Sequence, residues 1–250
     1  MTMNVPPKRL PLLCAAALGC LPGALPAQTA SDVTTLPAVR VEAGGIEDTA
    51  SSPVIGYTAR RSATATKTDT PLMETPQSVT VVTRDQMVDQ GATNIQDALN
   101  YAAGVRSDAY GLDSRTDSAR VRGADPDVYL DGLRQAFDYY TSTARTEPYT
   151  LERLEVLRGP AAMLYGQGST GGVINMVSKR PLDVFQGEVG VQLGSHDRKQ
   201  IQADLTGPLT EDGRLLYRIV ALKREADTQV HHVPDDRLVI APSLTWKPSA

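Results

Sequence analysis

The residue types that most often carry catalysis or metal binding are sparse and poorly spaced in this chain. Two of its three histidines, His231 and His232, are adjacent, so in a strand they would point to opposite faces and could not readily chelate one ion. The third, His196, falls in a predicted hairpin turn. The glycine-rich run at 166–172 lacks the Gly-Lys-Ser/Thr sequence of a phosphate-binding loop, and the G-x-S-x-G and H-E-x-x-H motifs are missing. We therefore expect no enzyme, no metal site and no cofactor.

The N-terminus has the composition of a secretory signal peptide. Two basic residues precede a short apolar run at 10–21, and small residues lead up to Ala27. We expect residues 1–27 to be removed; a buried N-terminal helix and a lipoprotein signal ending at Cys20 are the alternatives. The only other cysteine, Cys14, also lies in this leader, so the mature chain would lack disulfides and thiolate metal sites.

The overall charge of the chain bears on which classes of partner it can bind. The chain carries a net charge of −4 and has a pI of about 5.4, which argues against a general nucleic-acid binder. No apolar run outside the N-terminus approaches the roughly 18 residues of a membrane-spanning helix.

The most informative stretch is residues 151–181, LERLEVLRGPAAMLYGQGSTGGVINMVSKRP. It combines a charged amphipathic start, an Arg-Gly-Pro break, a glycine-rich turn that permits positive φ, an apolar strand at 173–177 and a basic end. This run closely resembles the end of the plug domain of TonB-dependent outer-membrane receptors.

The preceding segment has the elements of a compact α/β unit. A β-branched strand is predicted at 77–83. Two short helices follow, the first opened by Thr83 with Gln86 and closed by Gly91, and the second, at 95–102, opened by Thr93 with Gln96. Two short strands are predicted at 119–123 and 128–132, with a turn at Asp131-Gly132.

The order of these elements resembles the plug of ferrichrome-type hydroxamate siderophore receptors. The resemblance implies an α+β plug domain over residues 66–181, built from a small mixed sheet with short helices.

After Pro181 the pattern changes to strict alternation of apolar and polar residues. Segments near 185–193, 200–205, 215–224 and 238–247 read as about four strands, with Gly207-Pro208 and Asp212-Gly213 marking one turn. A soluble antiparallel sandwich shows the same alternation, but the signal peptide and plug favour the first strands of a transmembrane β-barrel over residues 182–250. Because a plugged transporter barrel needs about 22 strands, we expect this to be the front part of a longer receptor that does not transport by itself.

Residues 28–65 are rich in Thr, Ala, Ser and Gly and predict a flexible segment. Within it lies an extended-looking run that resembles the TonB box, the peptide that such receptors offer to TonB for strand addition. It consists of Thr35, Leu36, Pro37, Ala38, Val39, Arg40 and Val41.

Three tyrosines are the candidate ligand contacts, since tyrosine supplies rigid area with a polar tip. By position, Tyr140 aligns with a ligand-contacting tyrosine of hydroxamate receptors. Tyr139 stands where that family has phenylalanine, and Tyr110 where it usually has arginine, which counts against ferrichrome itself.

Two arginines, Arg122 and Arg158, match plug arginines that form a lock against barrel-wall carboxylates in this family. Bidentate guanidinium–carboxylate pairs would hold the plug and still allow it to move. Glu152 and Glu155 are possible partners within the plug.

The resemblance implies a TonB-dependent receptor for ferric siderophore uptake in the outer membrane of a Gram-negative cell. Its partners would be the siderophore, outer-membrane lipid, and TonB with its inner-membrane energising complex. The alternatives are a receptor for haem, cobalamin or another chelate, and a soluble periplasmic binding or adaptor module.

Overall fold

The computed structural model describes residues 48–109, 111, 113, 115–135, 145–160 and 162–248. The predicted signal peptide and residues 35–41 lie outside the described residues, as do Tyr110, Tyr139 and Tyr140. No helix within the described ranges is long and apolar enough to cross a membrane.

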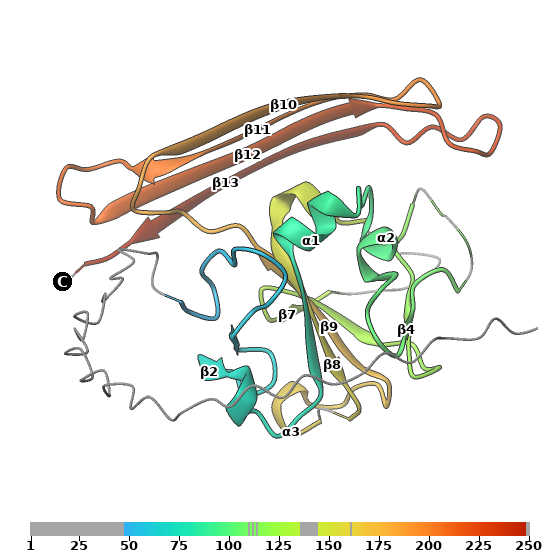
Figure 1. Cartoon of the computed structure of the whole chain (residues 1–250), viewed down its shortest axis with the longest axis vertical. Coiled ribbons are helices and arrows are strands. Elements are labelled where there is room, and N and C mark those ends of the chain that lie inside the picture. The colour runs from blue at the N-terminus through green and yellow to red at the C-terminus, as the bar shows by residue number, and fades with distance from the viewer. Residues whose placement is uncertain are drawn as a thin grey trace, which may run out of the picture. The chain divides into compact units, whose positions relative to one another are not determined.

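A five-stranded mixed sheet forms the centre of the first part of the chain (Figure 1). Its strands, in spatial order, are β3 (Val79–Thr83), β8 (Leu151–Arg158), β9 (Gly172–Ser178), β6 (Asp127–Leu130) and β7 (Leu133–Arg134). Strand β6 runs parallel to β9, and all other neighbours are antiparallel. Two short antiparallel pairs accompany the sheet: β1 (Arg61–Ser62) with β2 (Thr70–Pro71), and β4 (Val105–Arg106) with β5 (Arg120–Val121). The predicted small mixed sheet is confirmed.

The helices are short, as predicted. They are α1 (Arg84–Asp89), α2 (Ile95–Leu99) and α3 (Ala162–Tyr165), with single 3₁₀ turns η1 (Leu72–Glu74) and η2 (Pro148–Thr150). Thr83 caps α1 by accepting a hydrogen bond from the Gln86 N–H (3.3 Å), as the sequence predicted.

The predicted cap of α2 is wrong by one residue. Asn94, with its extended backbone, caps the helix by accepting from the Asp97 N–H (2.8 Å). The Thr93 hydroxyl instead donates to the Asp97 carboxylate, and the Gln96 side chain donates to the Ser107 carbonyl. The helix also ends at Leu99 rather than Ala102.

The core of this domain is packed on the central strand β8. Apolar residues of β8, β9 and β3 form one cluster with the buried faces of α1 and α2, for example Leu154, Val82 and Leu99. Two charged residues of β8 are buried with them: Arg153 lies 2.8 Å from Glu155, which also accepts from the Ser62 hydroxyl (2.6 Å). Burial of these charges is tolerated because they pair with each other.

The second part of the chain is an antiparallel meander (Figure 1). It consists of β10 (Gln186–Leu193), β11 (Lys199–Pro208), β12 (Leu215–Glu225) and β13 (Arg237–Trp246). The four predicted strands and the His196 turn are confirmed. Gly207-Pro208 is a correction: both residues still pair with β12, and the turn begins only after them.

The alternation of the sequence separates the two faces of this meander. Val191, Ile201 and Ile240 are among the large apolar side chains that stay exposed on one face. Asp204 and Arg218 lie on the opposite face and are buried. The covered face also contains the buried Leu216, Val220 and Leu222 of β12, so it is mixed. An apolar exposed face opposite a covered face that carries charges is the arrangement expected of a strand that faces lipid on one side only.

A substitution at Gly172 tests the backbone packing of the glycine-rich turn. Its φ is +125°, and a Cβ there would lie 3.1 Å from Arg158 Cα and overlap the Leu157 carbonyl oxygen. We expect Gly172→Ala to lower the free energy of unfolding by about 2 to 4 kcal/mol, because strain and overlap add. Gly91→Ala is the control, since Gly91 has φ +63° and nothing within 4 Å. It should cost only about 1 kcal/mol. Urea titrations followed by circular dichroism measure both, and equal losses would contradict this packing.

Candidate functional site

The mixed-sheet domain meets the polar face of the meander through two clusters of charged side chains. The first, here called the Asp204 cluster, consists of Asp204 on β11, Arg218 on β12 and Lys179, which follows β9. Arg218 donates to both carboxylate oxygens of Asp204 (2.8 Å each), and Lys179 Nζ donates to one of them (2.8 Å). All three side chains are at least 95% buried. One carboxylate therefore connects the two parts of the chain.

The link between the two parts is fixed by the same cluster. Arg218 also donates to the Arg180 carbonyl (2.9 Å), and the Leu182 N–H donates to the Thr206 hydroxyl (2.9 Å). Lys179 Nζ lies 4.0 Å from the centre of the Tyr149 ring, a cation–π contact. Burial lowers the pKa of Lys179 to about 8, and its Asp204 partner opposes this shift. The connecting residues are thus held in place.

The second cluster, here called the Arg224 cluster, joins Arg145, Glu147, Arg224 and Asp235. Arg224 on β12 contacts Glu147 at 3.0 Å and Asp235 at 3.3 Å, and Arg145 contacts the same Asp235 at 2.7 Å. Burial raises the pKa of Glu147, and the Arg224 charge opposes the rise. In the sequence, Arg145 and Glu147 come soon after the candidate residues Tyr139 and Tyr140, which lie outside the described residues.

Asp117 lies beside this cluster. Its carboxylate accepts from the Thr146 N–H (3.0 Å) and lies 3.6 Å from Arg145 Nε. Burial raises the pKa of Asp117 to about 6, and the hydrogen bond and the arginine only partly offset this.

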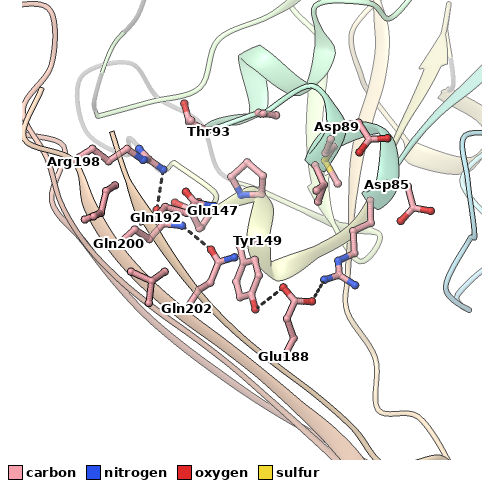
Figure 2. Close-up of a pocket in the computed structure, with 18 of the residues that line it drawn as sticks. Asp85, Asp89, Thr93, Glu147, Tyr149, Glu188, Gln192, Arg198, Gln200 and Gln202 are labelled. Atoms are coloured by element: carbon pink, nitrogen blue, oxygen red, sulfur yellow. Dashed lines mark hydrogen bonds and ion pairs between the residues drawn. The ribbon is translucent and has the colours of Figure 1, made fainter. Parts of the chain in front are cut away.

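A cavity of about 1030 Å³ lies along the same boundary. Figure 2 shows Gln192, Gln200 and Gln202 of β10 and β11 among the lining residues, together with Tyr149, whose hydroxyl donates to Glu188 (3.5 Å). Arg84 of α1 pairs with Glu188 at 2.5 Å. The boundary is therefore a mixture of ion pairs and an open space lined by polar and apolar residues.

Arg158 and Arg122 lie near each other, which the sequence did not predict. Arg158 donates to the Ala103 carbonyl (2.6 Å) and to the hydroxyls of Ser78 (2.7 Å) and Thr80. Burial lowers the pKa of Arg158, and the nearby positive charge of Arg122 adds to this. Across the described ranges, neither guanidinium pairs with a carboxylate.

Glu155 and Glu152, the two glutamates predicted as partners within the plug, have other charged neighbours. Glu155 is paired with Arg153 in the core. Burial raises the pKa of Glu152, and the charge of Arg218 on β12 is the strongest effect that opposes the rise. Glu152 is therefore electrostatically coupled to the meander.

Sequence reasoning missed both charge clusters. The available signal was a charge on the polar side of an alternating strand, as at Asp204, Arg218 and Arg224. This pattern indicates that the charged face is covered. It does not predict which residues pair with these charges, because Lys179 and Glu147 come from other elements.

Replacement of Asp204 tests the first cluster. We expect Asp204→Asn to lower the free energy of unfolding by about 3 to 5 kcal/mol, since it removes the carboxylate to which both buried cations donate hydrogen bonds. Glu225→Gln is the control, because the Lys223–Glu225 pair on β12 is exposed. It should leave the free energy of unfolding essentially unchanged, because an exposed ion pair is screened by solvent. The measurement is urea unfolding in detergent of the full-length protein that contains these residues, and equal effects would contradict a structural role for Asp204.

Comparison with known proteins agrees with this geometry. The family described as TonB-dependent Receptor Plug Domain matches residues 71–173. The chain is 37% identical over 206 residues to the ferrioxamine B receptor of Salmonella typhimurium, covering 80% of this chain and 29% of that protein. It is also 37% identical over 228 residues to the ferrichrome outer membrane transporter/phage receptor of Escherichia coli, covering 89% of this chain and 30% of that protein.

The similarity to a solved structure includes the three-dimensional fold. The ferripyoverdine receptor of the outer membrane of Pseudomonas aeruginosa, bound to ferripyoverdine, superposes with a TM-score of 0.71 at 31% identity, covering 81% of this chain and 26% of that one. The chain thus spans less than a third of the length of these relatives. Residues 71–173 therefore have the fold of a TonB-dependent receptor plug domain, and antiparallel strands follow them.

Proposed function

We propose that this chain is the N-terminal part of a TonB-dependent outer-membrane receptor that takes up a ferric siderophore. In this proposal the plug gates the lumen of a barrel that begins with β10–β13. The observation that carries it is the pair of buried charge clusters, which hold the plug to the polar face of strands whose other face is apolar and exposed.

The type of contact between plug and strands supports a gating role. Among the described residues, both buried apolar clusters lie entirely within the plug, between Ala65 and Met176. The hydrogen-bonded contacts to the meander are ionic and polar, and Leu216, Val220 and Leu222 are buried beside them on the same face of β12. Water can replace such contacts at a small net cost when the groups become hydrated, whereas separation of an apolar interface exposes all of its surface.

The ligand-contact residues remain those predicted by the resemblance, Tyr110, Tyr139 and Tyr140. The siderophore already coordinates its iron fully, so the protein needs aromatic walls and hydrogen-bond donors and no iron ligands. The Arg224 cluster supports this proposal, because two of its members, Arg145 and Glu147, follow Tyr139 and Tyr140 closely in the sequence.

The plug–barrel lock is proposed for Arg122 and Arg158, with Glu152 and Glu155 as charges within the plug. Two neighbouring guanidiniums without a carboxylate partner in the described part of the chain support it. Two neighbouring guanidiniums repel each other, and a carboxylate placed next to them would offset this repulsion. Barrel residues after position 250 are the proposed source.

Energy coupling is assigned to residues 35–41. The outer membrane holds no usable ion gradient, so uptake requires a physical connection to TonB. A peptide that adds as a strand to a sheet edge gains main-chain hydrogen bonds with little demand on its sequence.

Deletion of residues 35–41 from the full-length receptor tests the coupling. We expect uptake of iron from the cognate ferric siderophore to fall to background, while binding to the cell surface is unchanged, because the ligand site and the connection to TonB are separate. Radiolabelled iron, with and without collapse of the proton gradient, measures the two steps. Deletion of the seven residues 28–34 is the matched control. Normal uptake without residues 35–41 would contradict the TonB-box assignment.

A further inference from the structure

The connection between β4 and β5 is long for the short hairpin that it closes. The two strands pair only at Val105 with Val121 and at Arg106 with Arg120, and residues 107–119 join them. The structure describes this connection apart from positions 110, 112 and 114, and the described residues form no helix or strand. Connections of about 12 residues or more without regular structure are uncommon, and they are usually either functional or disordered. The contacts of this connection decide between the two.

One side chain of α2, that of Gln96, binds both arms of the connection. Its Nε2 donates to the carbonyl of Ser107, directly after β4 (2.8 Å), and to the carbonyl of Gly111 (3.2 Å). It also contacts the hydroxyl of Ser118, two residues before β5 (3.4 Å). Gln96 is only 6% exposed, and hydrogen bonds are stronger where water is excluded. A side-chain amide thus replaces the strand pairing that ends after Arg106.

Two further contacts hold the ends of the connection. The Ser107 hydroxyl donates to Asn100 Oδ1 at the end of α2 (2.5 Å). At the other end, Asp117 accepts from the Thr146 N–H (3.0 Å), which joins the connection to the residues before η2. Ser107 and Thr116 are each only 3% exposed. The connection is therefore anchored at both ends, which favours a functional loop over a disordered one.

The helix that carries Gln96 is a firm support. α2 lies beside β4 (Figure 1), and Asn94 caps its first turn. Ala98 and Leu99 on the same helix are fully buried in the apolar cluster of the plug. A side chain on a packed helix holds its partners more precisely than one on a loop. Gln96 therefore fixes the connection relative to the plug core.

The stability of the helix alone does not explain an amide at position 96. The other buried residues of α2 are Ile95, Ala98 and Leu99, all apolar. Gln96 Oε1 is buried and has no hydrogen-bond partner among the described residues, which is unfavourable. An apolar side chain would remove this unpaired acceptor and would lose only the bonds to the connection. The benefit of the amide therefore lies in the geometry of the connection.

We propose that Gln96 is a positioning residue for ligand binding: it holds residues 107–119 in the conformation that the ligand contacts. Gln96 does not itself touch the ligand. Tyr110, proposed above as a ligand contact, is adjacent in the sequence to Gly111, which Gln96 binds. The inference rests on the proposed uptake function and adds to it a residue on which the affinity depends.

Replacement of Gln96 by methionine tests the effect on affinity. Methionine has a similar length but lacks the two N–H donors. The probes are ferrioxamine B, ferrichrome and ferripyoverdine, each with radiolabelled iron, on outer membranes that contain the full-length receptor. For every probe that the unmodified receptor binds, we expect Gln96→Met to raise the Kd about tenfold or more, because the ligand must then order the connection itself. Uptake at saturating chelate should be unchanged, since Gln96 acts only on binding.

Val82→Ala is the control for a general loss of stability. Val82 is buried on β3 in the same apolar cluster, so its truncation destabilises the plug, and the Kd should not change. Urea unfolding in detergent ranks the stabilities of the variants. An unchanged Kd for Gln96→Met would overturn the proposal. An equal rise in Kd for Val82→Ala would also overturn it, because affinity would then follow stability.

Hydrogen exchange tests the positioning without any ligand. In the full-length Gln96→Met variant, peptides from residues 107–119 should exchange about tenfold faster or more, while peptides from β8 keep their rates. Gln96→Glu, which also lacks the donors, should change exchange and Kd in the same direction. Unchanged exchange in residues 107–119 would overturn the proposal whatever the receptor transports. If the unmodified receptor binds none of the three chelates, the proposed function itself is contradicted, and the role of Gln96 in binding is lost with it.

Discussion

The carboxylate of Asp204 is the interaction on which the arrangement of this chain most depends. It accepts hydrogen bonds from Lys179 at the end of the plug and from Arg218 on the neighbouring strand, and all three side chains are buried. Desolvation of three charges is costly, and the structure offsets that cost by directing both cations at one anion. The direction in which the chain leaves the plug and enters β10 follows from this geometry.

The same physics distinguishes the interior of the plug from its boundary. Inside, β8 and β9 pack against α1 and α2 with apolar side chains, and even the charged pair of Arg153 and Glu155 is enclosed. At the boundary, ion pairs lie beside buried apolar residues of β12 and a cavity of mixed lining. The plug therefore has an apolar core of its own and a boundary that is partly ionic, as the proposed gating role requires.

Features that depend on nearby residues were predictable from the sequence. The Thr83 cap, the turn at Asp131-Gly132 with φ values of 50° and 79°, and the four strands of the meander all follow from local patterns. The choice between Thr93 and Asn94 as a cap was not predictable, because it depends on which residue adopts the extended backbone. The turn after β11 was placed too early because Gly207 and Pro208, although frequent in turns, still pair with β12.

The charge clusters could not be predicted for a different reason. Lys179 and Asp204 are 25 residues apart in the chain, and Glu147 and Arg224 are 77 apart. Such pairs depend on the tertiary fold, and a strand pattern shows only that a charge lies on the covered face. The cavity is bounded by α1, η2, β10 and β11 together, so no single segment contains its signature.

A double-mutant cycle between Lys179 and Asp204 tests the central claim most directly. The free energies of unfolding of Lys179→Met, Asp204→Asn and the double variant are compared in the full-length protein. If the buried pair connects the plug to the strands, the double variant loses less stability than the two single variants together, with a coupling energy of about 1.5 kcal/mol or more. Additivity to within about 0.5 kcal/mol would contradict the account.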